Sequence, residues 1–299
     1  MENHAAGFVN IIGRPNVGKS TLMNALVGER MSIITRKPQT TRHRIFGILN
    51  GDDFQIVFSD TPGIIGQANY QMQKAMNAFV FGAFEDADVL LWMIDPFEEF
   101  DDENPLLKRM QHAECPVFLI VNKSDLLKEG QEETIRKNWE GAANFAQFLF
   151  ISAKEKRGTK ELMDILIATL PKSPPYFPKD QLTDRNERFF VSEIIREQLL
   201  LQYKKEIPYS CEVFIESFKD PLEGAAKPIT VIRAVIFVVR ATQKNIIIGS
   251  KGAAIKQLGI DSRREIEQFL ERSIYLELFV KVKDNWRDDA STLKQFGYT

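Results

Sequence analysis

One segment near the start of the chain has residues suited to bind phosphate groups. It reads Gly13-Arg14-Pro15-Asn16-Val17-Gly18-Lys19-Ser20 and has the spacing G-x-x-x-x-G-K-S. Its glycines let successive backbone N–H groups point at phosphate oxygens, and the positive end of the following helix adds to that attraction. In this pattern the lysine contacts the terminal phosphates and the serine hydroxyl binds Mg²⁺. The segment therefore predicts a nucleoside triphosphate site, which we extend by one residue to Thr21.

Three shorter segments indicate which nucleotide binds. Asp60-Thr61-Pro62-Gly63 offers an aspartate that can hold Mg²⁺ through water and a glycine N–H that can reach the γ-phosphate. In Asn122-Lys123-Ser124-Asp125, the Asp125 carboxylate can accept from guanine N1–H and the exocyclic amine together, and the Lys123 stem can lie on the base. In Ser152-Ala153-Lys154, the Ala153 N–H can meet guanine O6. Because all three follow apolar runs, and open parallel sheets bind ligands where strands end, they predict a guanine nucleotide site.

These segments require a sheet and helices to position them. Up to about residue 170, short apolar runs alternate with helical patterns, which predicts a doubly wound α/β domain with a mostly parallel sheet. The expected strands are Phe8–Ile12, Gln55–Ser59, Val89–Ile94, Val117–Val121 and Phe148–Ile151, with Arg44–Asn50 antiparallel beside Gln55–Ser59. The expected helices are Lys19–Val27, Tyr70–Glu85, Glu103–Gln111, Gln131–Asn144 and Thr159–Leu170.

A proline-rich segment interrupts this alternation. Four prolines fall between Pro171 and Pro178, which forbids a helix and stiffens an extended connection. We therefore expect a first domain at 1–171, a linker at 172–186 and a second domain at 187–299. A helix, two strands, two helical stretches and a strand predict that the second domain is a small α+β unit. These elements are expected at Arg188–Tyr203, Ser210–Phe218, Ile229–Arg240, on both sides of Gly249–Gly252, and at Ile274–Lys283.

Between the two helical stretches lies a G-x-x-G loop, Gly249-Ser250-Lys251-Gly252. From Arg240 to Arg264, six basic residues stand against Asp261 alone, a net charge of +5 in a chain of formal charge −2. Such a basic stripe is the footprint of a nucleic-acid site, although a solvated charged face is the alternative. The arrangement resembles a KH domain of type II order, in which the loop glycines let a single strand approach the backbone. The resemblance implies an RNA site formed by Ile248, Gly249, Ser250, Lys251, Gly252, Lys256, Arg263 and Arg264.

Composition excludes several other classes of protein. The chain has 299 residues, 44% apolar and 27% charged, which is typical of a folded protein of two domains. Its two cysteines, Cys115 and Cys211, lie in apolar runs expected to be strands, so we expect buried, reduced thiols and neither a disulfide scaffold nor a cysteine metal cage. No apolar run is long enough to span a bilayer and no signal peptide is apparent, so we expect a cytoplasmic protein.

The four nucleotide motifs resemble those of translation-factor-type P-loop GTPases. More narrowly, Lys37–Arg44 resembles the first switch of the Era family, and Gln181–Gln198 and Ile246–Gly259 also resemble Era, so the likeness covers essentially the whole chain. It implies a GTPase that uses GTP/GDP and Mg²⁺, assists maturation of the small ribosomal subunit and binds the 3′ region of its rRNA through the KH domain. It also implies that GTP orders the switch loops and thereby gates RNA binding.

The same resemblance bears on catalysis. Either Thr40 or Thr41 can complete the Mg²⁺ shell with Ser20 and Asp60, and the family pattern favours Thr41. Ras-like enzymes place a water-orienting glutamine just after the glycine that Gly63 matches, whereas this chain has Ile64 and Ile65, so we expect slow intrinsic hydrolysis. In related GTPases an asparagine at the place of Asn16 coordinates K⁺, which implies a further cofactor; the alternative is that Asn16 hydrogen-bonds only its own loop. The expected catalytic set is Asn16, Lys19, Thr41 and Gly63.

Two other functions stay open at this point. One is an RNA-binding assembly protein in which guanine nucleotide is a passive stabiliser. The other is a GTPase of tRNA modification or transport, which would need a transmembrane portion or a separate cofactor domain. We expect a monomer. Peripheral contact with the inner face of the cell membrane also stays open, although no segment is basic and amphipathic enough to require it.

Overall fold

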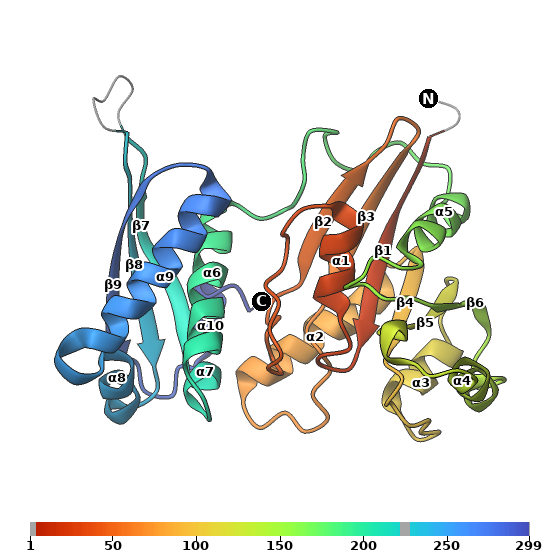
Figure 1. Ribbon diagram of the computed structural model, residues 1–299, viewed down its shortest axis with the longest axis horizontal. Coiled ribbons are helices and arrows are strands. Elements are labelled where there is room, and N and C mark those ends of the chain that lie inside the picture. The colour runs from red at the N-terminus through yellow and green to blue at the C-terminus, as the bar shows by residue number, and fades with distance from the viewer. Residues whose placement is uncertain (1–3, 222–227, 299) are drawn as a thin grey trace. The chain divides into compact units, whose positions relative to one another are not determined.

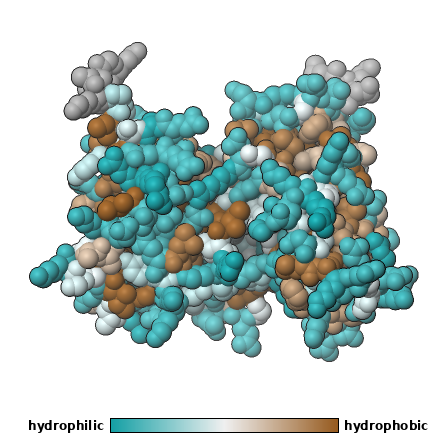
Figure 2. Space-filling model, in the orientation of Figure 1, coloured by the Kyte–Doolittle hydropathy of each residue, from teal (hydrophilic) through white to brown (hydrophobic). Residues whose placement is uncertain are grey.

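The computed structural model describes residues 4–221 and 228–298, and the chain divides into two compact units. The first unit comprises residues 1–67 and 74–184, and the second comprises residues 68–73 and 185–299. Each unit has its own sheet (Figure 1). On the face shown in Figure 2, hydrophilic side chains cover most of each unit and apolar side chains form small separate groups. Within the described ranges, no helix is long and apolar enough to cross a membrane.

The first unit contains a six-stranded sheet in the order β2-β3-β1-β4-β5-β6. Strand β2 pairs antiparallel with β3, and the other four pairings are parallel, which confirms the expected mostly parallel, doubly wound fold. Strands β4 and β5 are buried along their whole length because helices cover both faces of the sheet. The strands are β1 (Ala5–Gly13), β2 (Ile45–Asn50), β3 (Phe54–Asp60), β4 (Val89–Ile94), β5 (Val117–Val121) and β6 (Phe145–Phe150).

The helices of the first unit pack on this sheet in two layers. Side chains from α2, α3 and α4 share one core with alternate residues of β4 and β5, whereas α1 contacts α5 and strands β1, β2 and β3. The bounds are α1 (Lys19–Val27), α2 (Gln71–Glu85), α3 (Pro105–Gln111), α4 (Gln131–Trp139) and α5 (Thr159–Thr169). Because all four nucleotide motifs follow strands that run parallel, their residues meet at the carboxyl edge of the sheet.

Local details differ from the expected elements. Helix α4 ends at Trp139 rather than Asn144, since Glu140 is extended and Gly141 takes a left-handed conformation (φ 76°) that turns the chain. Both cysteines lie just before a strand rather than inside one. Both thiols are free, but only Cys211 is fully buried, and Cys115 is half-buried.

The proline-rich segment lies against the first unit. The Gln55 side chain on β3 accepts hydrogen bonds from the N–H groups of Tyr176 (2.7 Å) and Phe177 (3.0 Å) and donates to the Phe177 carbonyl (2.8 Å). Further on, the Ile48 N–H donates to the Leu182 carbonyl (2.8 Å). The first unit therefore holds this connection through residue 184, and the expected domain boundaries stay a prediction.

The second unit has a three-stranded sheet in the order β7-β8-β9, with β7 antiparallel and β9 parallel to β8. Helices α6 and α9 supply apolar side chains to one core with the inner face of that sheet. Helix α6 thus precedes the β7–β8 pair, and α8 and α9 lie between β8 and β9, which is the expected type II order with the short α7 added before β7. The elements are α6 (Glu187–Gln202), α7 (Ile207–Ser210), β7 (Glu212–Lys219), β8 (Thr230–Val238), α8 (Ala241–Ile248), α9 (Ala253–Leu270), β9 (Ile274–Val282) and α10 (Ala290–Gln295).

The C-terminal tail, to which no role was assigned from its sequence, packs against the second unit outside this core. The Trp286 ring is fully buried and its Nε1 donates to the Ser210 carbonyl (3.2 Å). The Phe296 ring lies against Phe237, with ring centroids 5.4 Å apart. The Tyr298 hydroxyl donates to Glu212 Oε2 (2.7 Å), and both side chains are buried. The tail therefore closes one side of the second unit.

Candidate functional site

A pocket of about 780 Å³ lies at the carboxyl edge of the first unit's sheet. The four motifs, although far apart in the sequence, meet around it. Of the expected residues, those that line it are Pro15, Asn16, Gly18, Lys19, Ser20, Thr21, Thr41, Gly63, Asn122, Lys123, Asp125, Ser152 and Lys154. Thr61 and Pro62 are buried, and the Thr61 hydroxyl donates to the Ile11 carbonyl (2.8 Å), so its side chain links the segment after β3 to β1.

Hydrogen bonds to the phosphate loop hold the Lys19 side chain at the pocket. Lys19 Nζ donates to the carbonyls of Gly13 and Arg14, each at 3.0 Å. Burial lowers the pKa of Lys19 to about 8, and the nearby carboxylates Asp60 and Glu98 oppose that shift. Helix α1 begins at this lysine, so its first N–H groups also face the pocket. The loop thus gathers one ammonium group and a helix amino terminus, the two features that attract phosphate oxygens.

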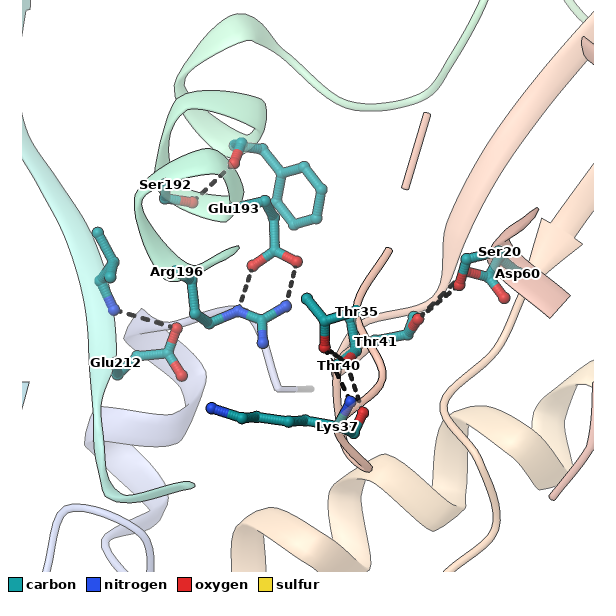
Figure 3. Close-up of polar contacts among 12 residues, drawn as sticks. Ser20, Thr35, Lys37, Thr40, Thr41, Asp60, Ser192, Glu193, Arg196 and Glu212 are labelled. Atoms are coloured by element: carbon teal, nitrogen blue, oxygen red, sulfur yellow. Dashed lines mark hydrogen bonds and ion pairs between the residues drawn. The ribbon is translucent and has the colours of Figure 1, made fainter. Parts of the chain in front are cut away.

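Three oxygen-bearing side chains form the candidate metal site (Figure 3). Ser20 Oγ donates to Asp60 Oδ2 (2.6 Å) and lies 2.9 Å from Thr41 Oγ1, which lies 3.3 Å from the same carboxylate oxygen. Asp60 Oδ1 is buried and has no hydrogen-bond partner among the described residues. Burial raises the pKa of Asp60, although Lys19 and the hydroxyl groups oppose it. A buried carboxylate with an unused oxygen, beside two hydroxyls, fits Mg²⁺, which prefers oxygen ligands.

No group of three or more His, Cys, Asp or Glu residues within residues 4–221 and 228–298 could hold a metal ion. The hydroxyl contacts distinguish the two candidate threonines. Thr40 Oγ1 donates to the Lys37 carbonyl (2.6 Å) and lies 2.6 Å from Thr35 Oγ1, within its own loop (Figure 3). Thr41, in contrast, contacts Ser20 and Asp60, as the family pattern implies.

Gly63 lies directly against the phosphate loop. A Cβ at this residue would come within 2.6 Å of the Pro15 backbone nitrogen, so no larger residue fits without moving the loop. The next side chain, Ile64, packs on the core beneath, and the backbone of Ile65 is held by the Asn77 amide (2.8 and 2.9 Å). Neither isoleucine can orient a water molecule with its side chain, which fits the expected slow hydrolysis.

The expected base site is tied together by Asn122. Its Nδ2 donates to the Val17 carbonyl (2.7 Å), and its Oδ1 accepts from the Ala153 N–H (2.9 Å). Asp125 is exposed at the pocket and accepts from Ser152 Oγ (2.5 Å), a hydrogen bond that lowers the pKa of the Asp125 carboxyl. The Asp125 carboxylate is therefore ionised and free to accept from a base. The Ala153 N–H donates to Asn122 in this structure, so the expected hydrogen bond from Ala153 N–H to guanine O6 stays a prediction.

Two acidic residues that the sequence did not point out lie at the edge of this site. Asp95 Oδ2 pairs with Lys123 Nζ (2.8 Å), and Glu98 Oε1 pairs with Arg14 Nε (3.1 Å). The Arg14 guanidinium therefore turns towards Glu98, and Arg14 does not line the pocket. Asp95 directly follows β4, and that position at a strand end is a signal that could have found it. Glu98 lies further along the loop, where no motif marks it.

In the second unit, the G-x-x-G loop joins α8 to α9. Gly249 adopts φ 71° and ψ 179°, a conformation open essentially to glycine alone, and a Cβ there would lie 2.6 Å from the Ala254 Cβ. Lys251 also has a positive φ, 49°, and its side chain is exposed. The loop therefore presents backbone and one ammonium group to solvent.

Two of the four basic residues expected to bind RNA around this loop lie next to carboxylates of their own helix. Lys251 and Lys256 are exposed, and neither forms an ion pair with another described residue. Arg263, in contrast, donates twice to Glu267 Oε1 (3.0 and 3.1 Å), and Arg264 lies 3.6 Å from Glu265. The two lysines therefore contribute unpaired positive charge beside the loop. Ile248 is partly buried against the core of the second unit, and the neighbouring Ile246 is 49% exposed.

Comparison with known proteins identifies both units. A family model described as "50S ribosome-binding GTPase" matches residues 8–123, and one described as "KH domain" matches residues 206–287. The protein is therefore a P-loop GTPase that carries a KH domain.

Relatives of full length narrow this class to one family. GTPase Era of Syntrophus aciditrophicus is 42% identical over 294 residues, which are 98% of this chain and 95% of that protein. The ERA-like chloroplastic GTPase of Oryza sativa subsp. japonica is 41% identical over 299 residues, 99% of this chain and 70% of that protein. The chain belongs to the Era family, which confirms the resemblance found in its motifs, and it is a GTPase.

Two solved structures share its fold closely. A variant of Era from Aquifex aeolicus, bound to GDP and AlF4⁻, is 35% identical with a TM-score of 0.90, and the match covers 99% of each chain. An Era structure with MgGDPNP and nucleotides 1506–1542 of 16S ribosomal RNA matches with the same identity, TM-score and coverage.

Proposed function

We propose that this GTPase is a ribosome assembly factor that binds the 3′ region of small-subunit rRNA through its KH domain, under the control of the bound guanine nucleotide. The observation that supports it best is the G-x-x-G loop, in which Lys251 is exposed and Gly249 approaches Ala254 too closely for a larger residue. The related Era that holds a 16S rRNA segment and MgGDPNP has the same two-part fold. A monomeric state and a cytoplasmic location go with this proposal as predictions.

Each motif has a defined task in the proposed nucleotide site. Lys19 contacts the terminal phosphates, the Gly63 N–H faces the γ-phosphate, and Asp125 selects guanine over adenine. Ser20, Thr41 and Asp60 would hold Mg²⁺, which when bound neutralises negative charge on the phosphates. Asn122 keeps the phosphate loop and the base-binding segments in register, because it bonds to Val17 and Ala153.

Thr41 connects the pocket to the loop between α1 and β2. The threonine reaches Ser20 and Asp60 only if that loop is folded over the pocket. Contacts with a γ-phosphate and Mg²⁺ stabilise the loop in this folded position. Hydrolysis removes the γ-phosphate and with it some of these contacts. The nucleotide state thereby changes the surface that the first unit offers, which is the basis of the proposed control of RNA binding.

We expect nucleotide state to change RNA affinity. With a GTP analogue bound, an oligoribonucleotide from the 3′ end of small-subunit rRNA should bind about 5-fold to 100-fold more tightly than with GDP, the usual range of coupling between two sites. Isothermal titration calorimetry of the full chain measures both dissociation constants. Equal constants would show that the two units bind independently, and no binding in either state would contradict the assignment of the RNA.

We also expect hydrolysis to depend on K⁺. Asn16 is exposed at the pocket, and its side chain makes no hydrogen bond within the described residues, so its amide oxygen is available to a cation. Phosphate release should be about tenfold faster in KCl than in NaCl at equal ionic strength, as expected when a cation neutralises transition-state charge. Asn16→Ala should remove the difference while GDP affinity stays within a factor of about two. Equal rates of phosphate release in both salts would contradict a role of Asn16 in binding K⁺.

A further inference from the structure

The loop after β4, residues 95–104, is strongly acidic, and two of its carboxylates turn towards the nucleotide site. Asp95 shapes the turn: its Oδ1 accepts from the Phe97 N–H (3.0 Å), and its carbonyl accepts from the Glu98 N–H (3.1 Å). At the same time Asp95 Oδ2 pairs with Lys123 of the base-binding motif (2.8 Å). The turn that carries Glu98 is therefore fixed to the nucleotide site itself.

Glu98 is packed against the phosphate loop. Its side chain is only 4% exposed, and Oε1 lies 3.1 Å from Arg14 Nε. That oxygen is buried, and no described residue donates a well-aligned hydrogen bond to it. The backbone carbonyl of the same Arg14 accepts from Lys19 Nζ (3.0 Å). One residue of the phosphate loop thus contacts both the Glu98 carboxyl group and the phosphate-binding lysine.

The protonation of Glu98 changes near neutral pH. Burial raises the pKa of Glu98 to about 7, where Asp95 adds to the shift and Arg14 and Lys19 oppose it. Among the described residues, the charged groups that act on it are these three, from its own loop, the phosphate loop and α1. When the carboxyl group is ionised, it places a negative charge beside the loop that has to receive negative phosphates.

We propose that Glu98 is a further positioning residue of the nucleotide site, whose ionised carboxylate weakens the binding of guanine nucleotide and whose protonated form does not. The inference rests on the proposed nucleotide site. The ionised Glu98 carboxylate, beside the phosphate loop, partly neutralises the positive charges of Arg14 and Lys19 that attract phosphate. Bound phosphate in turn favours the protonated carboxyl group, so binding takes up a proton near pH 7.

Fluorescent GDP titrated into the full-length chain between pH 6 and pH 8.5 tests this, with Mg²⁺ and ionic strength held constant. Glu98→Gln keeps the size of the side chain but cannot ionise. Because GDP itself titrates near pH 6, the quantity to compare is the ratio of wild-type to variant dissociation constants. We expect this ratio to be close to one at pH 6 and to rise to about threefold to tenfold at pH 8.5.

Glu99→Gln is the matched control, since Glu99 is the next residue, carries the same charge and is exposed. It should reproduce the wild-type dissociation constants at every pH. Glu98→Ala is the second non-ionisable variant if the glutamine variant does not fold. A ratio that stays constant from pH 6 to pH 8.5, or weaker binding by Glu98→Gln at high pH, would overturn the inference. Failure of the wild-type chain to bind GDP at any pH would overturn the proposed nucleotide site instead.

Discussion

Replacing Lys19 with alanine is expected to lower GTP affinity by about a hundredfold and the rate of hydrolysis at saturating GTP by about a thousandfold. The ammonium group is buried and already bonded to the Gly13 and Arg14 carbonyls. Without it, those carbonyl oxygens would face the phosphates with no positive charge between them. The hydrolysis rate falls more than the affinity does. Negative charge shifts within the phosphates in the transition state, and without Lys19 no ammonium group stabilises that shifted charge.

Fluorescent nucleotide titration and a phosphate-release assay measure the two effects. Lys160→Ala is a suitable control, because this exposed lysine on α5 carries the same charge and does not line the pocket. Its affinity and rate should stay within a factor of about two of wild type. If Lys19→Ala left both RNA binding and cellular function unaffected, the nucleotide would be a passive stabiliser, the alternative that the sequence left open.

Reversing the charge of the G-x-x-G loop is expected to lower RNA affinity by about a hundredfold. Ser250→Asp combined with Lys251→Asp removes one positive charge and adds two negative ones where a phosphodiester must approach the backbone. Both side chains are exposed, and neither belongs to the core of the second unit, so the fold should persist. Titration of the same oligoribonucleotide at several salt concentrations measures the loss and the change in its salt dependence.

GTP hydrolysis without RNA is the internal check, since the double substitution leaves the pocket unchanged. Lys204→Asp is the matched control: it reverses the charge of an exposed lysine in the second unit, outside the loop. It should cost less than about threefold in RNA affinity. A similar loss in the control would mean that RNA responds to the total charge of this unit, and unchanged affinity in the double variant would place the RNA elsewhere.

Much of the first unit was predictable because its function requires rare local features. A phosphate cradle needs a strand, a glycine-rich loop and a helix in that order, and the base-binding aspartate needs a strand end. The Asn122 amide bonds to both Val17 and Ala153, so it links the phosphate loop to the segments expected to bind the base. The parallel strands could also be predicted, because strands buried on both faces form continuous apolar runs in the sequence.

The features that were missed depend on tertiary packing. Helix α10 is six residues long and carries no clear apolar period, so the packing of Phe296, which follows it, is revealed by its ring contacts with Phe214 on β7 and Phe237 on β8. The pairing of Arg263 with Glu267 follows helical spacing and could have been predicted, which would have reduced the expected basic surface. Glu98 could not, because its burial depends on a turn formed by Asp95 far from Arg14 in the sequence.

The buried tail of the second unit has a practical consequence for proteolysis. A cut just before α10 would release the Phe296 ring from Phe214 and Phe237 and take the Tyr298 hydroxyl away from the Glu212 carboxylate. The remaining fragment would then expose the Phe214 and Phe237 rings on β7 and β8, an apolar surface prone to self-association. Removal of residues 290–299 is therefore expected to make the second unit prone to self-association without changing any residue that lines the nucleotide pocket.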